Sequence, residues 1–141
     1  MQVKGITIHN TGNRLSAEEM YNYLKFSGKL NLCHFLVDEQ RIIQTIDLNE
    51  QAYHTGKGYD LGNRHTIAVE ICRSTSNYGL YLKAQNKAVK LIKSLAKRYG
   101  LCKYDIYFHK DFDRTSNCPH RILEIYQTKK NFLRREIGDE L

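Results

Sequence analysis

The chain has 141 residues, of which 41% are hydrophobic and 26% charged, and its formal net charge is +7 at pH 7. This length suits one compact domain and is too short for two ordinary ones. No apolar run approaches the roughly 20 residues of a membrane-spanning helix, so we expect no membrane insertion. The first residues lead directly into a strand-like segment without the basic and apolar regions of a secretion signal. We therefore expect synthesis in the cytoplasm without an export signal.

The first half of the chain predicts a strand, a helix and a hairpin. Residues 3–9 are rich in Val, Ile and Thr and predict a strand that ends in turn residues. Ser16 and Glu19 have the spacing of a capping box, which predicts a helix that begins there and ends near Gly28. Residues 34–38 and 42–47 predict the two strands of a hairpin.

The second half predicts a glycine-containing loop over residues 56–62 and a further strand after it, then alternating helices and strands. Residues 67–72 predict a buried strand, and residues 81–99 predict the clearest helix because apolar side chains recur on one face. Residues 105–108 predict a strand, and apolar positions within 122–133 mark a final amphipathic helix. The element order predicts an α/β fold in which residues 1–141 form a single domain, with a mixed central β-sheet flanked by helices.

The positive charge implies an anionic partner but does not identify it. Nucleic acid, anionic lipid headgroups and the acidic polymers of a Gram-positive cell wall all fit. The charge is densest at residues 83–103 and 129–135, which are helix-like, so a solvated helix face explains much of it. We expect no nucleic-acid partner, because the chain lacks helix-turn-helix, RNP and zinc-finger spacing.

The sequence contains four cysteines without a CxxC pair: Cys33, Cys72, Cys102 and Cys118. Without a secretion signal, reduced cysteines are expected rather than a disulfide framework, with one or more serving as a ligand.

Two histidines and one cysteine are candidate metal ligands. His9 and His109 each follow an apolar strand, and Cys118 comes nine residues after His109. Two neutral imidazoles and a thiolate suit Zn²⁺, and three protein ligands leave a fourth position for water, as in catalytic zinc sites. Spacing alone leaves the alternative open that these histidines are structural.

Glu70 is a carboxylate within an otherwise apolar strand. Strand alternation places its side chain on the face opposite Val69 and Ile71. It is either an outward-facing residue or a general base held near a metal-bound water, with its pKa raised by a partly dry setting.

Several segments together resemble the zinc N-acetylmuramoyl-L-alanine amidases, a family that includes phage endolysins, bacterial autolysins and peptidoglycan recognition proteins. They occur in the family's order across nearly the whole chain: His9-Asn10-Thr11, His34-Phe35-Leu36-Val37-Asp38, Ala52-Tyr53-His54-Thr55-Gly56, Asn63, Ile67-Ala68-Val69-Glu70-Ile71, His109-Lys110-Asp111-Phe112 and Asn117-Cys118-Pro119-His120-Arg121-Ile122. The resemblance implies that the chain is an amidase catalytic domain with one Zn²⁺ bound by His9, His109 and Cys118.

The resemblance also implies roles for other residues. Glu70 matches the glutamate that deprotonates the zinc-bound water in the bacterial and phage branch. Cys33 stands where some relatives place a catalytic tyrosine, which makes this chain resemble the branch that relies on the glutamate. Relatives usually set a lysine or threonine two residues before the third ligand to stabilise the oxyanion, and here that position is Ser116. Thr115 is our preferred candidate for that role.

Arg114, Lys110 and Ser116 remain alternatives for the oxyanion. His34 and His54 match segments that line the family's substrate groove, so we expect them to bind substrate; the alternative for each is a structural histidine within the sheet or loop. Asn63 is a further expected substrate-binding residue, and Tyr53 and Tyr59 are additional candidates. His120 is an alternative third ligand to Cys118.

The implied function is zinc-dependent hydrolysis of the bond between N-acetylmuramic acid and L-alanine in peptidoglycan. The partners would be peptidoglycan and, through the positive surface, anionic wall polymers. A phage or prophage endolysin or an autolysin, acting on the wall after release from the cytoplasm, fits better than a cytoplasmic recycling amidase. A non-catalytic peptidoglycan-binding module of the same fold is the alternative.

Overall fold

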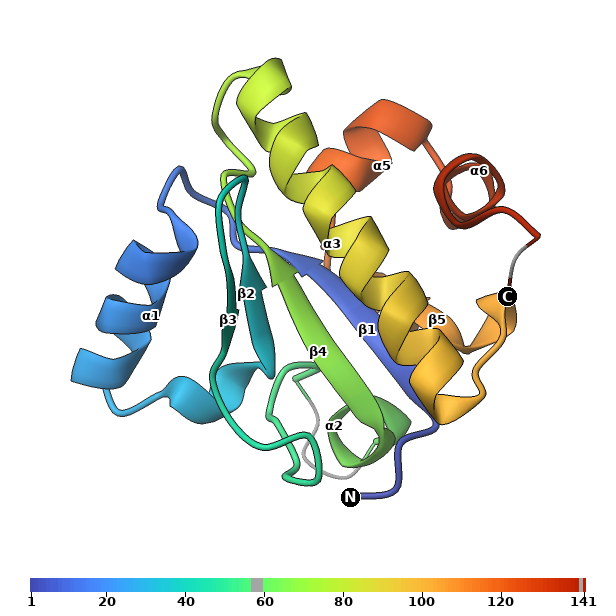
Figure 1. Cartoon of the computed structure of the whole chain (residues 1–141), viewed down its shortest axis with the longest axis horizontal. Coiled ribbons are helices and arrows are strands. Elements are labelled where there is room, and N and C mark those ends of the chain that lie inside the picture. The colour runs from blue at the N-terminus through green and yellow to red at the C-terminus, as the bar shows by residue number, and fades with distance from the viewer. Residues whose placement is uncertain (57–59, 140) are drawn as a thin grey trace.

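The computed structural model describes residues 1–56, 60–139 and 141. A five-stranded sheet in the order β3-β2-β4-β1-β5 forms its centre (Figure 1). The strands are β1 (Gly5–Asn10), β2 (Phe35–Val37), β3 (Ile42–Gln44), β4 (Thr66–Ile71) and β5 (Ile106–Phe108). Strand β1 pairs in parallel with β4 and β5, β2 pairs in parallel with β4, and β2 pairs in antiparallel fashion with β3. The mixed sheet predicted from the sequence is confirmed.

Alternation along the two central strands gives the sheet two different faces. In β1, Ile6 and Ile8 belong to the larger hydrophobic core, whereas Thr7 and His9 lie on the opposite face because successive side chains alternate. In β4, Ile67, Val69 and Ile71 join the same larger core, and Ala68 joins a smaller cluster on the other side. Polar groups of β1 and β4 are thereby collected on one face.

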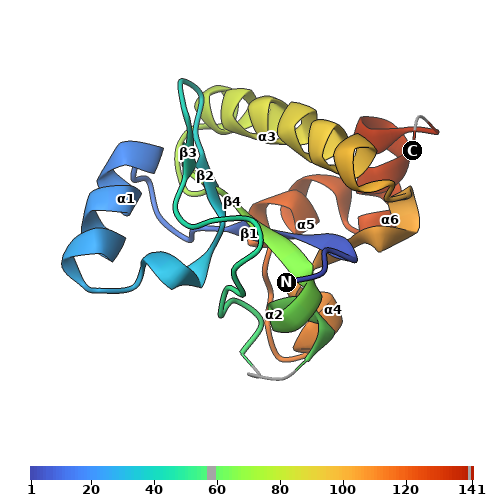
Figure 2. The ribbon, with the colours of Figure 1, turned by 60° about the horizontal axis from the view of Figure 1, so that its bottom comes forward.

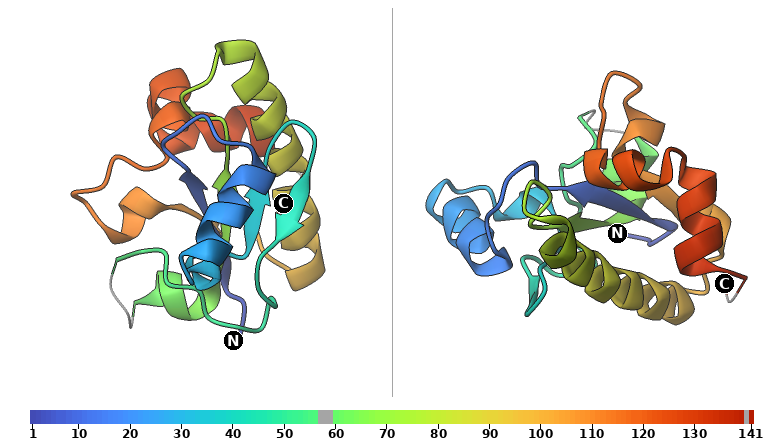
Figure 3. Two further views of the ribbon diagram at one scale, coloured as in Figure 1. Left: turned by 90° about the vertical axis from the view of Figure 1, so that its left-hand side faces the viewer. Right: turned by 90° about the horizontal axis from the view of Figure 1, so that it is seen from above.

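The larger core is covered by α3 (Tyr78–Tyr99), α5 (His120–Tyr126) and α6 (Lys129–Phe132), which continues into a π-helical turn at Leu133–Ile137. Helix α3 runs diagonally across the sheet, and α5 and α6 lie beside it (Figures 1 and 3). Helix α3 ends at Tyr99 and is capped by Gly100, whose left-handed backbone (φ 66°) is the conformation that glycine adopts without strain.

Shorter elements lie on the opposite face. Helix α1 (Ala17–Phe26) packs against β2 and β3 and leads into a 3-10 turn at Leu30–Leu32. Helices α2 (Leu61–His65) and α4 (His109–Phe112) lie at the bottom of the view in Figure 2, and Figure 3 shows the same elements from two other sides. A further 3-10 turn at Lys103–Asp105 precedes β5. This less densely covered face carries the candidate site.

Local hydrogen bonds explain where the elements begin and end. Ser16 caps α1 in the predicted capping box with Glu19. Helix α3 begins at Tyr78, three residues before the predicted start, because the Asn77 side chain accepts from the backbone N–H of Leu80 at 2.9 Å. The final helix is divided at Gln127, whose φ is 64°.

The loop predicted over residues 56–62 is only partly described, since residues 57–59 lie outside the described residues; helix α2, which the sequence did not predict, begins at Leu61. Among the residues that the structure describes, no helix combines the length and apolar character needed to cross a membrane.

Candidate active site

His9 and Glu70 are brought together by strand register. They are paired positions on the neighbouring parallel strands β1 and β4, so both side chains project from the same face of the sheet. The His9 Nδ1 atom lies 3.9 Å from a Glu70 carboxylate oxygen, and the Glu70 side chain is 20% exposed. The outward-facing interpretation of Glu70 therefore does not describe this geometry.

His109 and Cys118 are brought to β1 from the C-terminal part of the chain. His109 is the first residue of α4, directly after β5, and the backbone N–H of its neighbour Lys110 donates to the Cys118 carbonyl at 3.0 Å. This bond closes the loop between α4 and α5 and places Cys118 next to His109.

Asn10 holds Cys118 in place, a role that sequence reasoning missed. Its backbone N–H lies 3.4 Å from Cys118 Sγ, and its side-chain oxygen accepts from the backbone N–H of Arg121 at 3.0 Å. Its side-chain amide donates to the Tyr81 hydroxyl at 3.1 Å. A buried asparagine at the end of an apolar strand was the available signal, because buried polar side chains almost always have hydrogen-bond partners.

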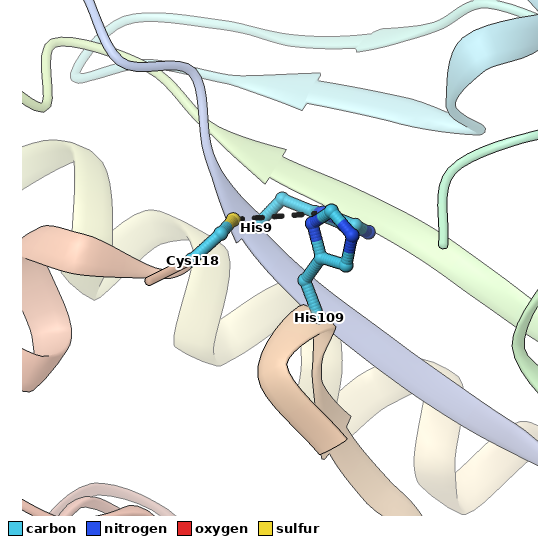
Figure 4. Close-up of side chains that lie close together, drawn as sticks. All are labelled: His9, His109 and Cys118. Atoms are coloured by element: carbon cyan, nitrogen blue, oxygen red, sulfur yellow. Dashed lines mark hydrogen bonds between the residues drawn. The ribbon is translucent and has the colours of Figure 1, made fainter. Parts of the chain in front are cut away.

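His9, His109 and Cys118 form a cluster that could hold a metal ion. One potential ligand atom from each lies within 4.8 Å of the others, and the three side chains point toward one another (Figure 4). His9 Nδ1 lies 3.7 Å from Cys118 Sγ. Among the described residues, His109 Nε2 and Glu70 Oε2 are buried atoms without a hydrogen-bond partner. Such atoms are rare in folded proteins, so the donor set fits a cation such as Zn²⁺.

Burial determines the protonation of this cluster. Desolvation, reinforced by His54 and His109, holds the pKa of His9 well below its ordinary value, and desolvation also lowers the pKa of His109. Both imidazoles are therefore neutral and can donate a lone pair. Desolvation and the nearby Glu70 raise the pKa of Cys118 to about 12, and desolvation raises the pKa of Glu70 to about 8. A bound cation opposes both increases because it favours the anionic forms.

The cluster opens into a cleft of about 330 Å³. Leu32, Tyr53 and Ser116 contribute to its walls, together with His54 and Glu70. A smaller cavity of about 120 Å³ adjoins it and shares Asn10, Leu32 and Glu70 with it. The cluster is therefore open to solvent through this cleft.

The residues expected to bind substrate occupy different environments. His34 is fully buried: its Nδ1 accepts from the backbone N–H of Ala68 at 3.0 Å, and its Nε2 lies 2.7 Å from the Glu50 carbonyl. Asn63 is buried, and its side-chain oxygen accepts from the backbone N–H of His54 at 2.7 Å. These contacts bind the two side chains to the protein's own backbone.

His54 and Tyr53 both line the cleft. The His54 ring is buried and lies against His9, whereas Tyr53 is 50% exposed. Tyr59 lies outside the described residues.

The candidates for stabilising the oxyanion, and the alternative third metal ligand, lie in different places relative to the cleft. Thr115 is exposed and donates its hydroxyl to Asp113 at 2.6 Å, whereas Ser116 lines the cleft. Cys33 is fully buried. His120 Nε2 lies 3.0 Å from the Ser74 hydroxyl and is not part of the metal-ligand cluster.

Three converging side chains that could bind a metal, beside a carboxylate and in an open cleft, match the arrangement of mononuclear metal hydrolases. A family model described as N-acetylmuramoyl-L-alanine amidase matches residues 1–121, and the chain belongs to this family. Its resemblance to the family, recognised in the sequence, is thereby confirmed.

Similar proteins are found among both curated sequences and solved structures. The chain is 40% identical over 124 residues to the N-acetylmuramoyl-L-alanine amidase CwlA of Bacillus subtilis, covering 87% of this chain and 45% of CwlA. The solved structure of PlyL superposes with a TM-score of 0.87 at 33% identity, covering 98% of this chain and 86% of PlyL. The catalytic domain of XlyA superposes with a TM-score of 0.81 at 32% identity, covering 92% and 85%. The chain spans less than half the length of CwlA.

Proposed function

We propose that this chain hydrolyses the amide bond between N-acetylmuramic acid and L-alanine in bacterial peptidoglycan, using one Zn²⁺ held by His9, His109 and Cys118. The observation that carries the proposal is the convergence of these three side chains beside Glu70, at the base of an open cleft. Family membership supplies the substrate class, because the similar curated proteins are named for this activity.

The chain's own groups account for the proton transfers. A bound zinc ion would supply Lewis acidity and lower the pKa of a water molecule toward 7. Glu70 lies beside His9, where its carboxylate can accept a proton from the attacking water and return it to the leaving nitrogen of L-alanine. Burial raises the pKa of Glu70 to about 8 in the metal-free protein, and a bound cation would lower it again, so that the ionised carboxylate can accept a proton near neutral pH.

We propose that the Ser116 hydroxyl, in preference to that of Thr115, donates a hydrogen bond to the tetrahedral oxyanion. The Ser116 oxygen accepts from the backbone N–H of Cys118 at 3.2 Å, which leaves its hydroxyl hydrogen free to donate into the cleft that it lines. The Thr115 hydroxyl already donates to Asp113. Loss of one oxyanion donor typically costs about 10²–10³ in rate.

The proposed role is lysis of the cell wall by an endolysin or autolysin, with anionic wall polymers as a second partner for the positive surface. The non-catalytic alternative predicts binding to peptidoglycan without cleavage.

Release of free amino groups from purified cell wall tests the proposal directly. We expect release that stops when a chelator is added and returns when Zn²⁺ is restored. Binding to the wall without any release at full zinc occupancy would support the non-catalytic module instead.

A further inference from the structure

The imidazole of His54 lies directly behind that of His9, on the side away from Cys118. His9 Nε2 and His54 Nδ1 are 2.9 Å apart, and the two rings meet edge to face with their centroids 5.0 Å apart. We propose that His54 is a positioning residue that fixes the tautomer and orientation of His9, so that His9 Nδ1 always presents a lone pair to the metal. This inference rests on the proposed function and assigns His54 a role other than substrate binding.

The directions of the hydrogen bonds between His9, His54 and Gly62 follow from the Gly62 carbonyl, which is the last group in this series. His54 Nε2 lies 3.0 Å from the backbone carbonyl of Gly62, and a carbonyl can only accept, so Nε2 carries a hydrogen. A neutral His54 then has its lone pair on Nδ1, and the facing Nε2 of His9 must be the donor. The proton of His9 is therefore held on Nε2.

The consequence appears on the other side of the His9 ring. With its hydrogen on Nε2, His9 has a lone pair on Nδ1, the atom that lies 3.7 Å from Cys118 Sγ and 3.9 Å from the Glu70 carboxylate. The opposite tautomer would direct an N–H at the metal position and leave two acceptors facing each other between His9 and His54. The contacts with His54 exclude that tautomer.

The chain of contacts continues into hydrogen bonds and close packing around Gly62. The Gly62 carbonyl also accepts from the Thr66 hydroxyl at 2.7 Å, and the backbone N–H of His54 donates to Asn63 at 2.7 Å. Gly62 is in tight contact with its surroundings, because a Cβ atom built there would lie 2.4 Å from Thr55 Cγ2. The His54 ring therefore has little freedom to leave its position behind His9.

A hydrogen-bond acceptor for the second ring nitrogen of a metal-binding histidine raises the affinity of that histidine for its metal. Removal of such an acceptor typically weakens metal binding about 10–100-fold. His54→Phe keeps a planar ring but has no acceptor for His9 Nε2–H. His54→Asn places an amide oxygen near the position of Nδ1 and restores that acceptor. His65→Phe is the matched control, because His65 lies in the same helix as Gly62 but bonds to the carbonyl of Gln2.

Two measurements test the inference without relying on activity. Competition with a chromophoric chelator should show zinc binding weakened about 10–100-fold in His54→Phe, largely recovered in His54→Asn and unchanged in His65→Phe. Imidazole ¹⁵N spectra of the metal-free protein should show His9 as the Nε2–H tautomer in the wild type and as a mixture of tautomers in His54→Phe. Thermal unfolding establishes that each variant is folded.

Wild-type zinc affinity in a folded His54→Phe variant, or a wild-type His9 tautomer in its spectrum, would overturn the inference. Equal weakening in the Phe and Asn variants would also overturn it, because the acceptor would then be irrelevant. Failure of the proposed function is a distinct result: the wild-type protein itself would not bind zinc or would not cleave cell wall.

Discussion

Glu70→Gln separates the proposed proton acceptor from the metal ligands with a minimal change in shape. Glutamine keeps the size of the side chain but cannot accept a proton from water. A positioned general base typically contributes about 10²–10⁴ in rate, which corresponds to roughly 3–5 kcal/mol of activation free energy. Because Glu70 is outside the three-residue cluster, the variant should still bind one Zn²⁺.

The same substitution should stabilise the metal-free protein at alkaline pH. Burial raises the pKa of Glu70 from 4.5 to about 8, so ionisation of this carboxyl is easier in the unfolded chain than in the folded one. Folded wild-type protein is therefore progressively destabilised as the pH rises from about 4.5 to 8. At about 1.4 kcal/mol per pKa unit the upper limit is roughly 5 kcal/mol, and partial exposure of the side chain reduces it to a few kcal/mol.

The assays are amino-group release from cell wall, zinc stoichiometry, and urea unfolding of the chelated protein at pH 5 and pH 8.5. Glu124→Gln is the control, because the Glu124 side chain is 63% exposed and pairs with Arg121 within helix α5. We expect Glu70→Gln to lose most activity, retain zinc, and gain stability over wild type at pH 8.5 but not at pH 5. Wild-type hydrolysis by Glu70→Gln would refute its role as the base, and equal stability at both pH values would refute the burial argument.

Three further predictions concern the third ligand, a close contact and a buried histidine. Cys118→Ser should weaken zinc binding measured by chelator competition. His120→Ala should bind zinc like the wild type, because His120 bonds to the buried Ser74. The reverse result would make His120 the ligand. Gly62→Ala should lower the free energy of unfolding by about 1–3 kcal/mol in urea titrations, because its Cβ would overlap the neighbouring loop, while Gly79→Ala, with its nearest contact at 3.7 Å, should not destabilise. Burial lowers the pKa of His34 below 6.5, so the unfolded state binds its proton first and stability should fall as the pH drops below about 6.5. Unfolding at pH 7 and pH 5 should show a smaller pH effect in His34→Leu, and an identical effect would contradict this explanation.

The sequence by itself determined the layered organisation of the chain. The alternation in residues 67–72 and the helical periodicity of residues 81–99 are local signals, since they depend only on side-chain direction along one element. The capping box at Ser16 is equally local, and the structure contains it as predicted. Helix α2 was missed because its five residues carry little periodic signal, and its cap depends on the Asp60 side chain.

The tertiary structure decided how the candidate site is assembled. His9 and Glu70 are 61 positions apart in the sequence and meet only because β1 and β4 pair in a particular register. Asn10 bonds to Arg121 and His54 bonds to His9 across long stretches of sequence, so no motif spacing identifies either partner beforehand. Residue types predict which chemistry is available, but hydrogen-bond direction and distance depend on the packing of segments far apart in the chain.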